Sequence, residues 1–198
     1  MKPHDNLLSE IASLYERYEL LSDFAPLPED LIPQQVIAHE RQASLMLQAE
    51  DKLKSASHAA LQEALIAASP DMHWREVYTQ DEASPVHVSY EFMSRLGVYA
   101  IIGDTGPFAS SELSLYMVYM PAGLTYPWHY HPAEELYFIL SGEAVFRRQG
   151  HEDRLMREGD VIVHETNQPH EMQTYDKACL SLAVWRNHLD IAPTLMAK

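Results

Sequence analysis

The spacing of hydrophobic residues along the chain is helical before about residue 70 and changes after it. Between residues 6 and 21, leucine, isoleucine and tyrosine recur at the three- and four-residue intervals that predict a helix. The segment 24–30, FAPLPED, interrupts this pattern because its two prolines cannot lie in a helix interior. A second helical pattern spans residues 29–69, with Pro33 marking a start or a break. We therefore expect residues 1–70 to form a helical N-terminal region.

From Trp74 onward the chain consists of short runs of β-branched, aromatic and aliphatic residues separated by turn signals. Candidate strands cover residues 73–78, 86–93, 96–103, 113–121, 124–130, 134–142, 143–149, 153–158, 160–164, 170–175 and 179–187. The residues at 141–142, 149–153 and 158–160 are typical of hairpin turns. Short strands at a spacing of about 8 to 12 residues predict an antiparallel sandwich or barrel.

The charge and cysteine content narrow the possible partners. Acidic residues outnumber basic ones by 29 to 14 among 198 residues, which gives a net charge of −15. Nucleic acids and anionic membranes bind clustered positive charge, so neither is an expected partner. Cys179 has no second cysteine for an internal disulfide, the N-terminal residues lack a signal peptide, and no apolar run approaches the roughly 20 residues that span a bilayer. We expect a cytoplasmic protein that acts on a small molecule or another protein.

Candidate metal ligands are concentrated in the segment 123–142, GLTYPWHYHPAEELYFILSG. Side chains alternate between the two faces of a strand, so His129 and His131 point to the same side. If the register holds beyond them, Glu135 and Tyr137 continue on that side. Two imidazoles and a carboxylate on one face form a metal site with open positions for substrate or water. His170 is the best candidate for a third imidazole.

This donor set suits one divalent transition metal, namely Fe(II), Zn(II), Mn(II), Ni(II) or Co(II). We expect the other histidines to be structural or solvated, with His87 and His164 as the most plausible exceptions. These other histidines are His4, His39, His58, His73, His87, His151, His164 and His188.

The spacing of these residues resembles the cupin family. Its first motif is matched by Gly123, His129, His131, Glu135 and Gly142. The second motif is matched in spacing by Gly159 and His170, whereas Glu165, Asn167 and Thr174 depart from its usual proline, glycine and asparagine. The resemblance implies a mainly β fold, a cupin double-stranded β-helix barrel over residues 71–198. The helical region 1–70 would precede this barrel and pack on it.

The aromatic residues beside these ligands resemble those of the cupin dimethylsulfoniopropionate (DMSP) lyases of marine bacteria, in the longer form with a helical N-terminal region. That family has a tyrosine two residues after the metal-binding glutamate, a second tyrosine ahead of the histidine pair and a tryptophan on a late strand. The resemblance implies that Tyr137 is the general base, that Tyr126 is a second catalytic or orienting group, and that Trp185 forms a pocket wall. The implied reaction is β-elimination of zwitterionic DMSP to dimethyl sulfide and acrylate.

Aromatic faces attract cations, so Trp185, Tyr126 or Tyr119 is expected to hold the sulfonium group of that substrate. A divalent metal would stabilise the negative charge that develops on the substrate carboxylate. If Tyr137 itself coordinates the metal, His129 is displaced from the metal and faces the substrate instead.

Other functions stay open at this stage. A cupin dioxygenase would use the same ligands to hold Fe(II) and would consume oxygen, whereas a lyase needs none. A non-catalytic cupin module would bind a ligand without turnover, although the helical third is acidic and lacks a basic recognition helix. A sugar-phosphate isomerase is less favoured because the motif region has no cluster of lysine and arginine for a phosphate. The N-terminal helices are expected to form a lid, a packing layer or the interface of a homodimer.

Overall fold

Antiparallel pairing joins distant parts of the C-terminal two thirds of the chain. The structure, a computed structural model, describes residues 3–29, 31–79 and 89–196. Its strands are β1 (Ile32–Pro33), β2 (Gly97–Ile102), β3 (Phe108–Ala109), β4 (Leu113–Met120), β5 (Thr125–Tyr130), β6 (Glu134–Arg148), β7 (Arg154–Arg157), β8 (Val161–His164), β9 (His170–Gln173), β10 (Cys179–Arg186) and β11 (Thr194–Leu195). Strand makes up 35% of the described residues and helix 25%, so the predicted mainly β fold is confirmed.

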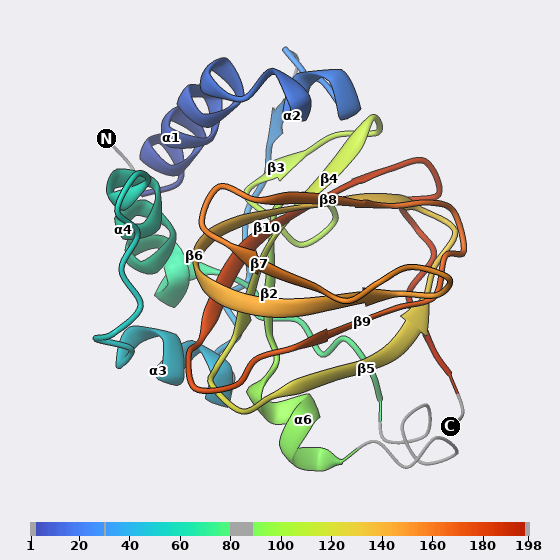
Figure 1. Cartoon of the computed structure of the whole chain (residues 1–198). Coiled ribbons are helices and arrows are strands. Elements are labelled where there is room, and N and C mark those ends of the chain that lie inside the picture. The colour runs from blue at the N-terminus through green and yellow to red at the C-terminus, as the bar shows by residue number, and fades with distance from the viewer. Residues whose placement is uncertain (1–2, 30, 80–88, 197–198) are drawn as a thin grey trace.

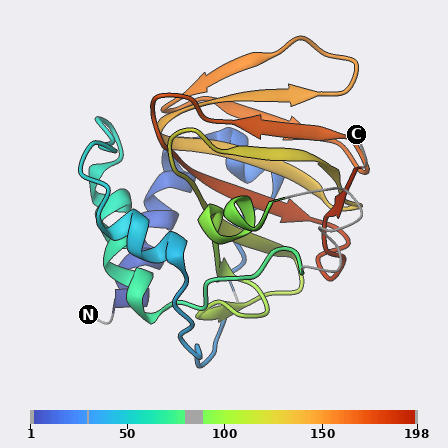
Figure 2. The same ribbon diagram turned by 90° about the horizontal axis from the view of Figure 1, so that it is seen from below.

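The helices precede most of the strands. They are α1 (Pro3–Arg17), α2 (Glu19–Phe24), α3 (Gln42–Gln48), α4 (Ala59–Ala68), the 3-10 helix η1 (Ser69–Asp71) and α6 (Tyr90–Arg95). In two perpendicular views α1, α3 and α4 lie to one side of the strands (Figure 1, Figure 2). None of the helices in the described ranges combines the length and the apolar character needed to cross a membrane.

The barrel has two layers of strands, and the long strand β6 belongs to both. Its first half pairs with β10 and β8, and its second half pairs with β7 and β9. The strand order β2-β4-β10-β6-β9-β5 then closes the two layers around a common interior. Gly142 lies where β6 passes from one layer to the other, and its φ of +77° is a conformation that favours glycine. The predicted hairpin turn at 141–142 is therefore wrong, because this glycine bends a continuous strand.

The central strands bury both of their faces. On β6, Leu136 and Phe138 point outward into the core that includes Leu7 and Ile11 of α1, whereas Tyr137 points into the barrel. The same alternation holds for β4 and β10, whose residues are divided between the two cores. The helices thus cover the outer face of this sheet and leave its inner face to line the site.

The helical N-terminal region differs in detail from its prediction. The helix expected over residues 6–21 is divided at Tyr18 into α1 and α2. The region 29–69 is not one long helix, because residues 49–58 between α3 and α4 are irregular. The Gln62 side chain holds this loop by accepting from the backbone of Ser55 and donating to the carbonyl of Leu53.

Two predicted strands are wrong: residues 73–78 form only isolated bridges at His73 and Trp74, and the described part of residues 86–93 is helical. Residues 86–88, including His87, lie outside the described residues. Tyr90–Arg95 is helical, and Ser89 caps this helix by accepting a hydrogen bond from the Phe92 backbone at 3.1 Å. A serine at the N-cap satisfies a backbone donor that the helix itself leaves free, which favours the helix over the strand.

Replacing Gly142 with alanine is expected to destabilise the protein strongly. A left-handed conformation costs a non-glycine residue about 1–2 kcal/mol. A Cβ at residue 142 would in addition overlap the backbone carbonyl of Ala178. Gly150→Ala is the matched control, because Gly150 has a φ of +82° but nothing within 4 Å of its Cβ position. Urea unfolding of both variants measures the difference, and equal losses of unfolding free energy would contradict the steric role of residue 142.

Candidate metal centre and pocket

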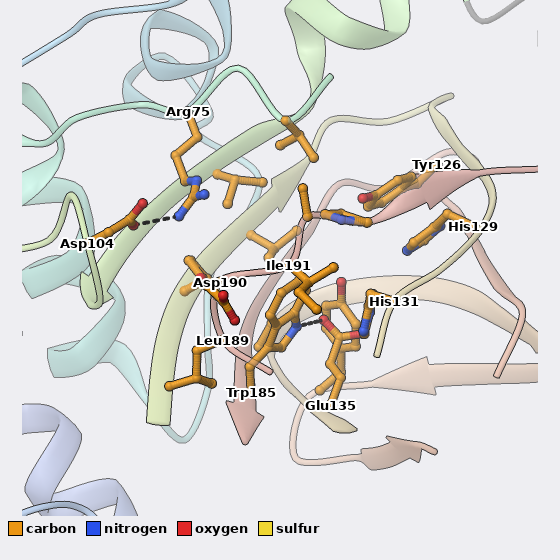
Figure 3. A pocket seen from close by; sticks show the side chains of 18 of the residues that line it. Arg75, Asp104, Tyr126, His129, His131, Glu135, Trp185, Leu189, Asp190 and Ile191 are labelled. Carbon is orange, nitrogen blue, oxygen red and sulfur yellow. Dashed lines mark hydrogen bonds and ion pairs between the residues drawn. The ribbon is translucent and has the colours of Figure 1, made fainter. Parts of the chain in front are cut away.

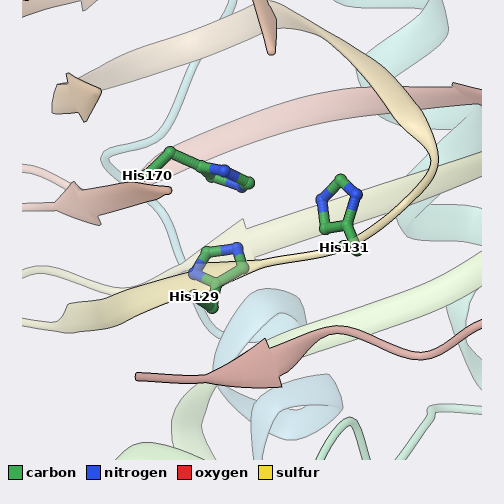
Figure 4. Close-up of side chains that lie close together, drawn as sticks. All are labelled: His129, His131 and His170. Atoms are coloured by element: carbon green, nitrogen blue, oxygen red, sulfur yellow. The ribbon is translucent and has the colours of Figure 1, made fainter. Parts of the chain in front are cut away.

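Three histidines from two neighbouring strands meet inside the barrel. His129 lies at the end of β5 and is the register partner of His170 on β9, and His131 follows β5 directly. The ring centroids of His129 and His131 lie 4.1 and 5.1 Å from that of His170, and all three side chains are buried (Figure 4). The structure therefore brings together the three histidines that the sequence predicted as ligands.

The same backbone contact orients each of these imidazoles. In His129, His131 and His170 the Nδ1 atom lies 2.8, 2.9 and 2.8 Å from a backbone carbonyl oxygen two residues away. A carbonyl only accepts, so each Nδ1 carries a proton, and each Nε2 is the ring atom that can bind a metal once it is unprotonated. Hydrogen bonds of this kind are how proteins orient metal-binding histidines.

Glu135 adds a carboxylate to this cluster and is itself buried. Its Oε2 atom lies 3.3 Å from a ring nitrogen of each of His131, His164 and His170. Burial favours the neutral acid, but these three histidines outweigh burial and hold the pKa of Glu135 well below its ordinary value. Its Oε1 atom accepts a hydrogen bond of 2.6 Å from the indole of Trp185. The carboxylate is therefore ionised and fixed at both oxygens.

His164 also belongs to this cluster, although the sequence singled it out only as a possible exception among structural histidines. It ends β8 and is the register partner of Glu135 on β6. Burial, followed by the charge of His170, lowers the pKa of His164 to about 4, so the ring is neutral near pH 7. The available signal was alternation within β8, since Ile162 and His164 are its two buried residues.

The donor set fits a divalent transition metal. Two groups of three residues each have potential ligand atoms within 4.8 Å of one another, namely His129, His131 and His170, and Glu135, His164 and His170. Within the described residues, the buried Nε2 atom of His164 has no hydrogen-bond partner, and the nearest polar atom given for Nε2 of His170 is the Glu135 carboxylate at 3.3 Å. Buried nitrogen atoms normally have a partner, and imidazole with carboxylate is a common ligand set for zinc and iron.

A pocket of about 310 Å³ opens onto this cluster (Figure 3). The residues that line its inner end are Tyr126, His129, His131, Glu135, Tyr137 and Trp185, and those farther out include Arg75, Tyr116, Asp104 and Asp190. Four of the aromatic or imidazole side chains named as catalytic or substrate-binding candidates, Tyr126, His129, Tyr137 and Trp185, are thus in the pocket wall. The Arg75 guanidinium lies over the ring of Tyr116 and donates to Asp104 at 2.9 Å.

Tyr119 does not line the pocket, contrary to its predicted role in holding a sulfonium group. Side chains alternate along β4, and Tyr116 and Val118 face the pocket while Tyr119 faces the helices. The hydroxyl of Tyr119 lies 3.5 Å from the Glu50 carboxylate on that side. Tyr116 is the residue that this strand contributes in its place, and its ring meets that of Trp185 edge-on at 5.5 Å.

A double-stranded β-helix with histidines and a glutamate gathered in its interior defines this protein as a cupin. Residues 28–181 match the dimethylsulfoniopropionate lyase family. The chain belongs to that family.

Individual relatives agree over nearly the whole chain. The DMSP lyase DddQ of Ruegeria pomeroyi is 41% identical over 190 residues, which are 96% of this chain and 92% of that protein. Its crystal structure superimposes with a TM-score of 0.92 at 40% identity, over 98% of this chain and 96% of that one. A second solved structure, from a set of the DMSP lyases RdDddP and RnDddQII, gives a TM-score of 0.90 at 31% identity, over 98% and 97%. Because both superpositions cover 98% of this chain, the similarity extends to the N-terminal helices.

The substitution His170→Ala is expected to weaken metal binding most, because His170 belongs to both groups of potential ligands. Metal affinity should fall by more than the roughly 10- to 100-fold that is typical when a residue hydrogen-bonded to a metal ligand is removed. His151→Ala is the control, since His151 is exposed and outside both groups. Calorimetric titration with Mn(II) or Zn(II) measures the affinities. Unchanged affinity in His170→Ala would contradict the assigned centre.

Proposed function

We propose that this chain is a metal-dependent carbon–sulfur lyase that cleaves DMSP to dimethyl sulfide and acrylate by β-elimination. The observation that carries the proposal is the Tyr137 phenol in the pocket wall, on the same strand face as the buried Glu135 carboxylate, in a member of the DMSP lyase family. The α-proton leaves to a base, the α-carbon and β-carbon form a double bond, and the C–S electron pair departs with sulfur.

His129, His131, Glu135 and His170 are the proposed metal ligands, with His164 beside them. Fe(II), Zn(II), Mn(II), Ni(II) and Co(II) all suit this donor set. Such a cation supplies positive charge that stabilises the enolate-like carboxylate of the substrate and lowers the pKa of nearby acids. We place the enzyme in the cytoplasm, and its single cysteine, Cys179, is a buried free thiol.

Tyr137 is the proposed base. Burial, followed by the charge of Glu135, raises the pKa of Tyr137 well above its ordinary value. The protein groups alone therefore disfavour ionisation of this phenol, and a cation held by the neighbouring ligands would favour it. A base with a high intrinsic pKa suits this reaction, because the proton on the carbon bonded to a carboxylate is weakly acidic.

Trp185 is better placed than Tyr126 to offer an aromatic face to the sulfonium group, whereas the ring of Tyr116 already has the Arg75 guanidinium over it at 5.2 Å. One face of Tyr126 is stacked on His129 at 3.9 Å, and Phe92 lies near its ring at 5.4 Å. Tyr126 therefore presents its hydroxyl rather than its face to the pocket (Figure 3). This arrangement supports Tyr126 as an orienting hydrogen-bond donor and Trp185 as the wall for the cation.

The direct test is headspace analysis for dimethyl sulfide after purified protein loaded with Fe(II) or Mn(II) is mixed with DMSP under nitrogen. We expect release that needs the metal, does not need oxygen and stops after treatment with a chelator. Absence of dimethyl sulfide after loading with each of Fe(II), Zn(II), Mn(II), Ni(II) and Co(II) would reject the substrate assignment. Oxygen uptake would then test a dioxygenase.

Tyr137→Phe is expected to lower kcat by about 10²- to 10⁴-fold, the range for loss of a general base, while metal content is retained. Tyr119→Phe is the matched control, because it removes another phenol from the same sheet but outside the pocket. That control should keep nearly full activity. Full activity in Tyr137→Phe would remove this residue from the mechanism.

A further inference from the structure

Behind the pocket wall, Tyr126 is in contact with a second buried phenol, Tyr78. The two hydroxyl oxygens lie 2.9 Å apart, and the side chains are 2% and 4% exposed for Tyr78 and Tyr126. Tyr126 lines the pocket, whereas Tyr78 does not. Tyr78 lies 48 residues before Tyr126 in the chain, so this contact is formed only by the folded barrel.

The burial of Tyr78 decides which hydroxyl donates. Tyr126 is its hydrogen-bond partner within the described part of the chain. If Tyr126 donated, the Tyr78 proton would be buried without an acceptor, which costs about 1–3 kcal/mol. If Tyr78 donates, both groups are satisfied, because the Tyr126 proton then faces the pocket, where substrate or water accepts it. Among the described residues, the arrangement with Tyr78 as the donor is the one that satisfies both hydroxyls.

Tyr126 is held on its other sides as well. His129 stacks on its ring with an interplanar angle of 6°, and Phe92 packs at 40° to it. These ring contacts restrict the plane of Tyr126 but leave its hydroxyl proton free to rotate. Only a partner at the phenol oxygen can select the direction of that proton, and Tyr78 occupies this position.

We propose that Tyr78 is a positioning residue that donates to the Tyr126 hydroxyl and so directs the Tyr126 proton to the substrate carboxylate. The inference rests on the proposed lyase function and names a residue that the sequence did not single out. As the α-proton leaves, negative charge builds up on the carboxylate and a hydrogen bond from Tyr126 strengthens. An interaction that strengthens in the transition state affects kcat more than KM.

Tyr78→Phe tests the proposal because it removes the donor and keeps the ring. We expect kcat to fall about 3- to 10-fold, the size typical of one hydrogen bond, with KM changed less than about 2-fold. Tyr99→Phe is the matched control: Tyr99 is also a fully buried phenol, but it donates at 2.8 Å to the carbonyl of Leu65 in the core under the helices. This control should lose thermal stability and keep its kcat.

The double variant Tyr78→Phe/Tyr126→Phe separates positioning from a general structural effect. If Tyr78 acts through Tyr126, its removal has no further effect on kcat once the Tyr126 hydroxyl is gone. Additive losses, or a Tyr78→Phe enzyme with the kcat of the unmodified protein, would overturn the inference and leave the lyase function standing. An unmodified protein that releases no dimethyl sulfide would instead reject the function, and the inference with it.

Discussion

A buried carboxylate must be compensated, and Glu135 is compensated by groups from four separate segments of the barrel. Its two oxygens contact His131 after β5, His164 on β8, His170 on β9 and Trp185 on β10. Leaving such a charge unpaired in a protein interior costs several kcal/mol, so these strands have to be in register for the fold to be stable. The same convergence places nitrogen and oxygen donors around one point. Fold stability and the capacity to hold a metal therefore depend on one side chain.

The helices make this interior possible. A sheet with one polar inner face still needs an apolar layer on its other face, and the outward residues of β6, such as Leu136 and Phe138, pack with Leu7 and Ile11 of α1. That outer core adds hydrophobic burial to the inner core of the barrel, which shares its space with the histidines and the glutamate. The N-terminal region thus acts as a structural layer whose position frees the inner face for chemistry.

The parts of the site that sequence reasoning could predict are those that local geometry determines. Alternation along β5 was enough to place His129 and His131 on one side, whereas Glu135 lies on the next strand, β6, after a short connection. His164 required the pairing of β8 with β6, a long-range contact that strand patterns do not encode. Tyr119 was assigned to the wrong face because β4 is apolar on both faces, so alternation alone does not show which one faces the pocket. Likewise, a glycine that bends one strand has the same local signature as a hairpin turn, which explains the error at Gly142.

Under the proposed function, the charge of Glu135 has two opposite effects on the pKa of Tyr137: it raises this pKa directly, and it attracts a cation that would lower it. Burial raises the pKa of Tyr137, and the negative charge of Glu135 raises it further, which makes the phenolate harder to form but stronger as a base once formed. The same charge attracts the divalent cation, whose positive charge lowers that pKa. A cation held by these ligands would therefore favour ionisation of the base and would also stabilise the product charge. One carboxylate, Glu135, would link the two effects, because it faces both the phenol and the metal ligands.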